Sequence, residues 1–254
     1  MFAQQRQQQI IELLKKENSV KASKLVDLFK VSLETIRRDL ESLEGQGLLK
    51  RVHGGAVFNK SNETEQTFLS RELLNKAEKQ EIATIASSYI KEGQSIALDV
   101  STTNTELAKV IKQKFERLTI LTNSLPIALE LAEKPHFTII LVGGMLRNQE
   151  LCVVGELAES FVSQFHIDTL FLSMSGISLT AGLTDYGVGE VQLKKKLLLM
   201  ASKCYVVADS SKFDGKSLLK VCDFVDVKGI ITDSRLDLTV KKKYNTNGIS
   251  IIDE

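Results

Sequence analysis

The spacing of apolar residues divides the 254-residue chain into two parts. Up to residue 57, apolar residues recur every three or four positions, which is typical of amphipathic helices. We predict helices over residues 6–16, 23–29 and 31–43, and then a strand over residues 48–52. Farther along, short continuous apolar runs alternate with helical patterns. That alternation predicts an α/β domain, Rossmann-like, with a mostly parallel sheet.

The second part begins after a polar stretch. Residues 58–69 are polar and lack periodicity, so we expect a linker there between domains at residues 1–57 and 70–254. The expected strands of the second domain are residues 95–99, 118–122, 137–142, 169–174, 204–208, 227–231 and 249–252. The expected helices are residues 71–91, 102–115, 126–133, 157–165, 189–202 and 236–243.

Residues 31–43 have the features of a helix that buries one face. The Ser32 hydroxyl is placed to cap its first turn. The stripe expected to be buried comprises Leu33, Ile36, Leu40 and Leu43. Hydrogen-bonding groups and cations lie on the other faces: Thr35, Arg37, Arg38 and Ser42. Such a helix, following a short turn after another helix, is how helix-turn-helix proteins present side chains to the major groove of DNA.

A short basic hairpin is expected to follow this helix. Lys50 and Arg51 lie in the predicted strand, and His53, Gly54 and Gly55 form a turn. Their cations are placed to contact phosphates beside the groove. The pattern as a whole therefore favours a winged helix-turn-helix domain whose partner is a double-stranded DNA operator.

The segment VSLETIRRDLESLEGQGLLKRVHGGAV resembles the DNA-binding signature of the DeoR family of bacterial transcriptional regulators. Four later segments, IALDVSTTNTELA, LTILTNSLPIA, LVGGMLR and VADSSKF, resemble the family's sensor domain. The resemblance implies a fold similar to ribose-5-phosphate isomerase, a phosphorylated sugar or related metabolite as effector, and assembly of dimers or tetramers through the second domain. Ser101, Ser173 and Met174 depart from the family pattern, in which glycine, glycine and alanine are usual.

Ligands of such sheets bind beyond the carboxyl ends of the strands. The residues expected there are Asp99, Ser101, Thr102, Thr103, Asn123, Ser124, Gly143, Gly144, Arg147, Thr184, Asp185 and Lys212. Residues 101–103 lie where a strand leads into a helix, so their N–H groups suit an anion such as phosphate. Arg147 and Lys212 would add positive charge. Asp99 and Asp185 would accept hydrogen bonds from a polyol.

Charge and cysteine content add expectations about the partner and the location of the protein. Residues 1–57 hold 10 Lys and Arg against 7 Asp and Glu, and the rest holds 23 against 25, so the positive charge is concentrated in the first part. We expect three reduced cysteines, no metal, no cofactor, no membrane segment and a cytoplasmic location. One recognition helix reads few base pairs, so we also expect self-association on paired half-sites.

Three functions remain open from the sequence. The first is a regulator, a repressor of a carbohydrate-metabolism operon, controlled by a sugar phosphate. The second is a sugar-phosphate isomerase, which would need a positioned carboxylate as general base. The isomerase resemblance would place that carboxylate at residues 192–196, which read QLKKK, and Glu190 is displaced by about one helical turn. The third is an architectural DNA binder, which would leave the α/β domain without a role.

Overall fold

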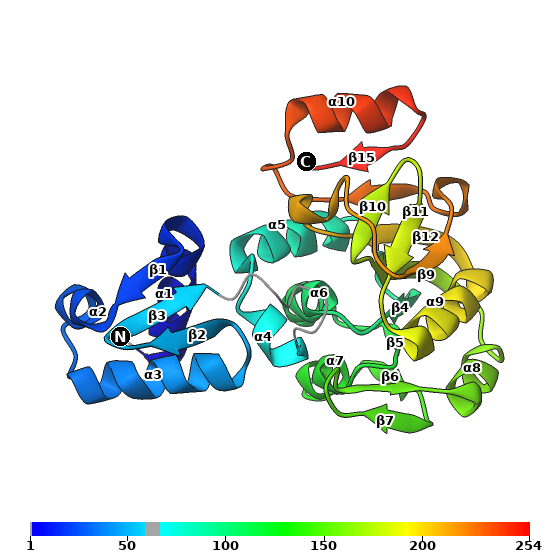
Figure 1. The fold of residues 1–254 in the computed structure, drawn as a ribbon. Helices are drawn as coiled ribbons and strands as arrows, with labels where there is room; N and C mark the ends of the chain where they lie inside the picture. Colours follow the sequence, from blue (N-terminus) through cyan, green and yellow to red (C-terminus); the bar gives the residue numbers. More distant parts are fainter. Residues whose placement is uncertain (1, 59–66) are drawn as a thin grey trace. The chain divides into compact units, whose positions relative to one another are not determined.

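The computed structural model describes residues 2–58 and 67–254. It divides into two compact units, Met1–Lys76 and Ala77–Glu254 (Figure 1). Most of the linker expected at residues 58–69 falls on residues 59–66, outside the described residues. The helix α4 (Phe68–Glu72) begins inside the expected linker, because Thr67 caps it by accepting from the Ser70 N–H at 3.3 Å.

Residues 2–58 of the first unit form a three-helix domain with a small antiparallel sheet. The helices are α1 (Ala3–Glu17), α2 (Ala22–Phe29) and α3 (Leu33–Gly45), and the strands are β1 (Ser19–Lys21), β2 (Leu49–Val52) and β3 (Gly55–Phe58), in the order β1-β3-β2. Its core draws Ile10, Leu14, Leu25, Ile36 and Leu43 together, all almost fully buried. Helix α2 ends at Lys30, whose left-handed φ of 54° makes the turn into α3.

One residue of the stripe expected to be buried is exposed instead. Leu33 retains 45% of its accessible surface. Leu33 is the first residue of α3, where there is no preceding turn of the helix for it to pack against. The buried face of α3 instead comprises Ile36, Asp39, Leu40 and Leu43.

A seven-stranded parallel sheet forms the centre of the second unit, in the order β15-β14-β12-β9-β4-β5-β6. The strands are β4 (Ser95–Leu98), β5 (Thr119–Thr122), β6 (Thr138–Leu141), β9 (Ile167–Ser173), β12 (Ala201–Val207), β14 (Gly229–Ile231) and β15 (Ile251–Ile252). The chain builds outward from β4 to β6, returns to β9 beside β4, and then builds outward the other way. This is the doubly wound order, which reverses between β4 and β9, and ligands of such sheets bind beyond the carboxyl ends of the strands at such a reversal.

Helices cover both faces of the sheet, as the alternation of side chains requires. Ile96 and Leu98 of β4 pack in one cluster with α5 (Lys76–Ser87), α6 (Thr102–Lys114) and α7 (Leu125–Leu131). Ala97, between them, packs in the other cluster with α8 (Glu156–Val162), α9 (Val188–Met200) and Tyr244 of α10 (Leu238–Thr246). The expected single helix over residues 71–91 is in fact α4 and α5, because Asn75 between them has a left-handed φ of 50°.

Two small sheets were not expected from the sequence. The hairpin of β7 (Met145–Arg147) and β8 (Cys152–Val154) follows β6. The strands β10 (Gly176–Ser178), β11 (Gly182–Asp185) and β13 (Leu219–Cys222) form an antiparallel sheet beside α9. Each of these strands has only three or four residues, too few for a clear periodic pattern.

Candidate functional site

Helix α3 is held by a cap at one end and by a buried ion pair at its middle. The Ser32 hydroxyl accepts from the Thr35 N–H at 3.1 Å, as the sequence predicted. Inside the domain, Arg6 of α1 donates to both carboxylate oxygens of Asp39, from Nε at 2.5 Å and Nη2 at 3.1 Å. Both side chains are more than nine-tenths buried. The pair therefore fixes the rotation of α3 relative to α1.

With Asp39 turned inward, the polar residues of α3 face solvent. Arg37 and Arg38 are exposed, and Arg38 Nε lies 3.3 Å from Glu34 Oε1 one turn earlier. Exposed pairs of this kind contribute little to stability, so Arg38 is available to a partner. Thr35 contacts the Ser32 hydroxyl at 2.9 Å, and Ser42 accepts from the Gln46 side chain at 3.2 Å.

The basic hairpin forms as expected, with Lys50 opposite Val57 and Arg51 opposite Ala56. His53 and Gly54 make its two-residue turn, in which the φ of Gly54 is +80°. A Cβ on Gly55 would lie 2.1 Å from the Val20 carbonyl oxygen, so only glycine lets β3 approach β1 here. The turn also contacts α2, because the Ala22 N–H donates to the Gly54 carbonyl at 2.8 Å.

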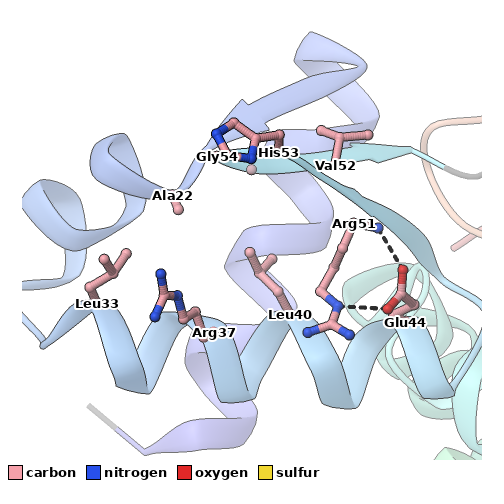
Figure 2. A pocket seen from close by; sticks show the side chains of 10 residues that line it. Ala22, Leu33, Arg37, Leu40, Glu44, Arg51, Val52, His53 and Gly54 are labelled. Carbon is pink, nitrogen blue, oxygen red and sulfur yellow. Dashed lines mark hydrogen bonds and ion pairs between the residues drawn. The ribbon is translucent and has the colours of Figure 1, made fainter.

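A groove of about 480 Å³ lies between α3 and this wing (Figure 2). Its floor is apolar, and its polar side chains are Arg37, Glu44, Arg51 and His53. Lys50 lies on the wing outside the groove lining and is exposed. The sequence-predicted DNA contacts are thus brought together on α3 and the wing.

In the second unit, a buried charge network lies at the carboxyl ends of β4 and β9. Asp99 follows β4, Ser173 ends β9, Asp185 ends β11, and Lys194 enters from α9. Lys194 Nζ lies 3.0 Å from Asp99 Oδ2, contacts Asp185 Oδ2, and donates to the Ser173 carbonyl at 2.6 Å. Both aspartates were expected as acceptors for a polyol. Their carboxylates are instead occupied by Lys194 and by neighbouring serines, with Ser173 Oγ donating to Asp99 and Ser175 Oγ to Asp185.

The same network shifts the pKa values of the two aspartates in opposite directions. Burial raises the pKa of Asp99, and the Lys194 ammonium offsets this only in part. Burial also opposes ionisation of Asp185, but Lys194 and the Ser175 hydroxyl outweigh it and hold the pKa of Asp185 below its ordinary value. For Lys194, the two carboxylates overcome burial and raise its pKa. The cation is therefore permanently charged at neutral pH.

The amino end of α6 lies directly beyond Asp99. The Ser101 hydroxyl caps the Asn104 N–H at 2.9 Å, and the Thr105 N–H donates to the Ser101 carbonyl at 3.0 Å. Within the described chain, the N–H groups of Thr102 and Thr103 have no partner. They are the groups that an anion at a helix N-terminus uses.

The other predicted effector residues lie around this end of the sheet in different environments. Asn123 bridges two loops, accepting from the Val100 N–H at 3.0 Å and donating to the Val153 carbonyl at 3.1 Å, and Ser124 caps α7. Gly143 and Gly144 form the turn from β6 to β7, and Arg147 Nη1 donates to Glu190 at 2.8 Å. Thr184 Oγ1 donates to the Gly176 carbonyl at 3.1 Å. Lys212 follows β12, two strands away from β4, where it helps to lower the pKa of the buried Asp209.

Sequence reasoning missed Lys194 and did not expect Glu190 to pair with Arg147. Lys194 stands in a run of three lysines, which was considered only for its lack of a carboxylate. A signal was present, because Val191, Lys194 and Leu197 follow at intervals of three and share one helical face. All three are buried.

Comparison with known proteins agrees with this architecture. Residues 6–62 match the DeoR-like helix-turn-helix domain, and residues 74–234 match the DeoR C-terminal sensor domain. The chain belongs to the DeoR family. This DeoR-family chain is thus a DNA-binding transcriptional regulator. It is 39% identical to the HTH-type transcriptional regulator YulB of Bacillus subtilis (strain 168), over 93% of this chain and 91% of that protein.

Other relatives are similar over nearly their whole length. The DeoR-family chain is 35% identical to the HTH-type transcriptional regulator GolR of Listeria innocua, over 99% of this chain and 98% of that protein. It is 32% identical to the glycerol-3-phosphate regulon repressor of Escherichia coli (strain K12), over 97% of each. A D-ribose-5-phosphate isomerase solved with phospho-erythronic acid aligns with 54% of each chain, at 15% identity and a TM-score of 0.41. That similarity is too low to indicate an activity.

Three further features of the DeoR-family chain concern metal binding, membrane helices and thiols. Among the described residues, no three His, Cys, Asp or Glu side chains are grouped to hold a metal ion. None of the described helices is long and apolar enough to cross a membrane. The cysteines at 152, 204 and 222 are buried free thiols, and burial raises the pKa of each, so they are poor nucleophiles.

Proposed function

We propose that this regulator represses a carbohydrate-metabolism operon, and that a phosphorylated sugar or related metabolite sets its affinity for DNA. The observation that carries the effector proposal is the amino end of α6. There the N–H groups of Thr102 and Thr103, which have no partner among the described residues, lie beside the point where the strand order reverses. The E. coli relative named for the glycerol-3-phosphate regulon supports the same class of effector.

The proposed effector site has an anion end and a polar end. The phosphate binds the N–H groups of residues 101–103 and the Thr102 hydroxyl, and Lys212 adds positive charge. The hydroxyls of the metabolite lie toward Asn123, Arg147 and the Asp99–Lys194–Asp185 network. Lys194 contacts one oxygen of Asp99 and one of Asp185, and the other oxygen of each accepts from neighbouring protein donors, so a hydroxyl that binds either aspartate has to share an oxygen with a donor already present.

The same pairing favours sensing over catalysis. An isomerase needs a carboxylate free to take a proton from its substrate. Asp99 and Asp185 each accept from Lys194, and Glu190 accepts from Arg147. Each of these carboxylates is therefore stabilised as an acceptor rather than held ready as a base. We infer that the second unit binds its metabolite without converting it.

For DNA, we propose that Arg38 reads base edges while Lys50 and His53 contact phosphates. Two copies of the chain would place two α3 helices on paired half-sites, because a single helix reads too few base pairs for a useful operator. Self-association through Ala77–Glu254 would supply the second copy.

Thermal-shift measurements on the full chain test the effector proposal. The panel pairs each phosphorylated compound with its unphosphorylated parent, including glycerol 3-phosphate with glycerol. A true effector raises the melting temperature with concentration, because it binds the folded state alone. Thr102→Ala and Lys212→Ala should abolish the shift, whereas Lys216→Ala, an exposed lysine four residues farther on, should retain it. Equal shifts from a sugar and its phosphate would contradict the anion site.

A further inference from the structure

The wing of the DNA-binding unit carries a cation that is already paired. Arg51 lies in β2, opposite the last turn of α3. Its Nε donates to Glu44 Oε2 at 2.6 Å, and its backbone N–H donates to Glu44 Oε1 at 2.7 Å (Figure 2). One carboxylate thus contacts both the charge and the backbone of Arg51.

Glu44 and Arg51 both line the groove between α3 and the wing. The groove suits one strand of a DNA backbone. Its apolar lining residues, suited to deoxyribose, are Ala22, Leu33, Leu40 and Val52. Its polar groups for phosphate are Arg37, Arg51 and His53. Among the ten residues that line it, Glu44 is the only carboxylate. A phosphate entering the groove therefore meets one negative group placed against one of its two arginines.

The wing does not need this ion pair in order to fold. Four residue pairs join β2 to β3, three pairs join β3 to β1, and the Ala22 N–H donates to the Gly54 carbonyl. The Glu44 and Arg51 side chains remain 34% and 42% exposed. Exposed ion pairs contribute little to stability, so a structural role does not account for a carboxylate at this position.

We propose that Glu44 limits the affinity of the regulator for the DNA backbone by neutralising Arg51 inside the groove. A regulator with high affinity for any duplex would be held by the large excess of non-specific sites in a genome. Glu44 reduces that sequence-independent part of the binding and leaves base readout by α3 unchanged. The inference rests on the DNA-binding role of the first unit.

The test compares full-length variants on a duplex of random sequence. Glu44→Gln removes the charge and keeps an oxygen that accepts from the Arg51 N–H. It should bind more tightly, by about three- to tenfold at moderate salt, because Arg51 becomes free to neutralise one more phosphate. The slope of log K against log salt concentration should become steeper by about 0.9. Glu44→Ala should give the same direction of change.

Two controls make the result specific to this pair. Glu12→Gln makes the same change in net charge at an exposed position of α1 and should leave the slope unchanged. Glu44→Gln combined with Arg51→Gln restores the wild-type charge of the groove and should return both affinity and slope to wild-type values.

The outcomes separate the inference from the proposed function. A Glu44→Gln protein that binds no more tightly than wild type, or a double variant that keeps the gain, overturns the role of Glu44. A wild-type protein that binds no duplex at any salt concentration overturns the assignment of the DNA-binding surface itself. Circular dichroism melts of each variant show whether the wing domain is folded in the comparison.

Discussion

Lys194 Nζ lies 3.0 Å from Asp99 Oδ2 at a position where both side chains are almost completely removed from solvent. The same ammonium contacts Asp185, so one cation compensates two carboxylates. Removing a charged partner from a buried pair leaves an uncompensated charge, which is far more costly than losing an exposed pair. The stability of the second unit (Ala77–Glu254, the sensor unit) therefore depends on this one lysine.

Lys194→Met should destabilise the sensor unit by about 3–5 kcal/mol at pH 7. The loss should be smaller at lower pH. Without Lys194, burial and mutual repulsion raise the folded-state pKa of both carboxyls above their unfolded value of about 3.9. A raised folded-state pKa means that the penalty is full above it and is relieved as pH falls through it.

Urea unfolding at pH 5, 6, 7 and 8 measures this dependence. Lys195→Met removes the neighbouring lysine, which is exposed, and should change stability by no more than about 0.5 kcal/mol at any pH. A Lys194→Met penalty that stays constant from pH 5 to 8 would show that the two carboxyls do not titrate as described.

The Arg6–Asp39 pair should respond differently to single and double replacement. Arg6→Met leaves a buried carboxylate unpaired and Asp39→Leu leaves a buried guanidinium unpaired, so each should cost about 3–5 kcal/mol. The double variant should be less destabilised than the sum of the two single variants. Thermal unfolding of the four proteins gives the coupling free energy. Strict additivity would mean that the two side chains do not stabilise each other.

Gly55→Ala should disrupt the sheet of the DNA-binding unit. Its Cβ would lie 2.1 Å from a backbone oxygen of Val20, and backbone cannot move aside as a flexible side chain can. We expect a loss of several kcal/mol and loss of DNA binding, measured by thermal unfolding and gel shift. Gly45→Ala, at the end of α3, meets nothing within 4 Å and should be neutral or slightly stabilising. A mild effect of Gly55→Ala would contradict the close approach of β3 to β1.

Base and phosphate contacts should separate in gel-shift titrations at several salt concentrations. Arg38→Ala should weaken operator binding by about 1–3 kcal/mol and affect random DNA much less. Lys50→Ala should weaken both DNAs evenly and lower the salt slope by about one. The operator can be obtained by selection of bound fragments from a random pool. Equal losses from Arg38→Ala on both DNAs would make Arg38 a phosphate contact.

Much of this arrangement could be predicted because local signals and tertiary structure agree. Continuous apolar runs such as residues 204–208 indicate strands buried on both faces, and the structure confirms that sheet. The Ser32 cap was predictable for the same reason, since capping depends only on neighbouring residues in the chain.

The interior charges were not predictable from residue type alone. Asp99 and Asp185 were expected to accept hydrogen bonds from a polyol, because ligands of such sheets bind beyond the strand ends. What occupies them is Lys194, which is 95 residues away from Asp99 in sequence, and no local pattern relates two such positions. Leu33 shows the opposite error, because an apolar residue in phase with a buried stripe loses its neighbours at the first turn of a helix.

The reversal of strand order between β4 and β9 has a consequence for how the sensor unit could yield to its metabolite. The segment after β4 leads to β5 and the segment after β9 leads to β12, so the chain leaves these two neighbouring strands toward opposite edges of the sheet. There the halves meet through side chains: Asn104 reaches the Phe171 carbonyl at 2.9 Å, and Asp99 accepts from the Ser173 N–H at 2.9 Å. A metabolite that binds these same donors and acceptors would compete with the hydrogen bonds that join the two halves of the sheet. Tighter binding of the metabolite would then make it easier for the two halves to separate.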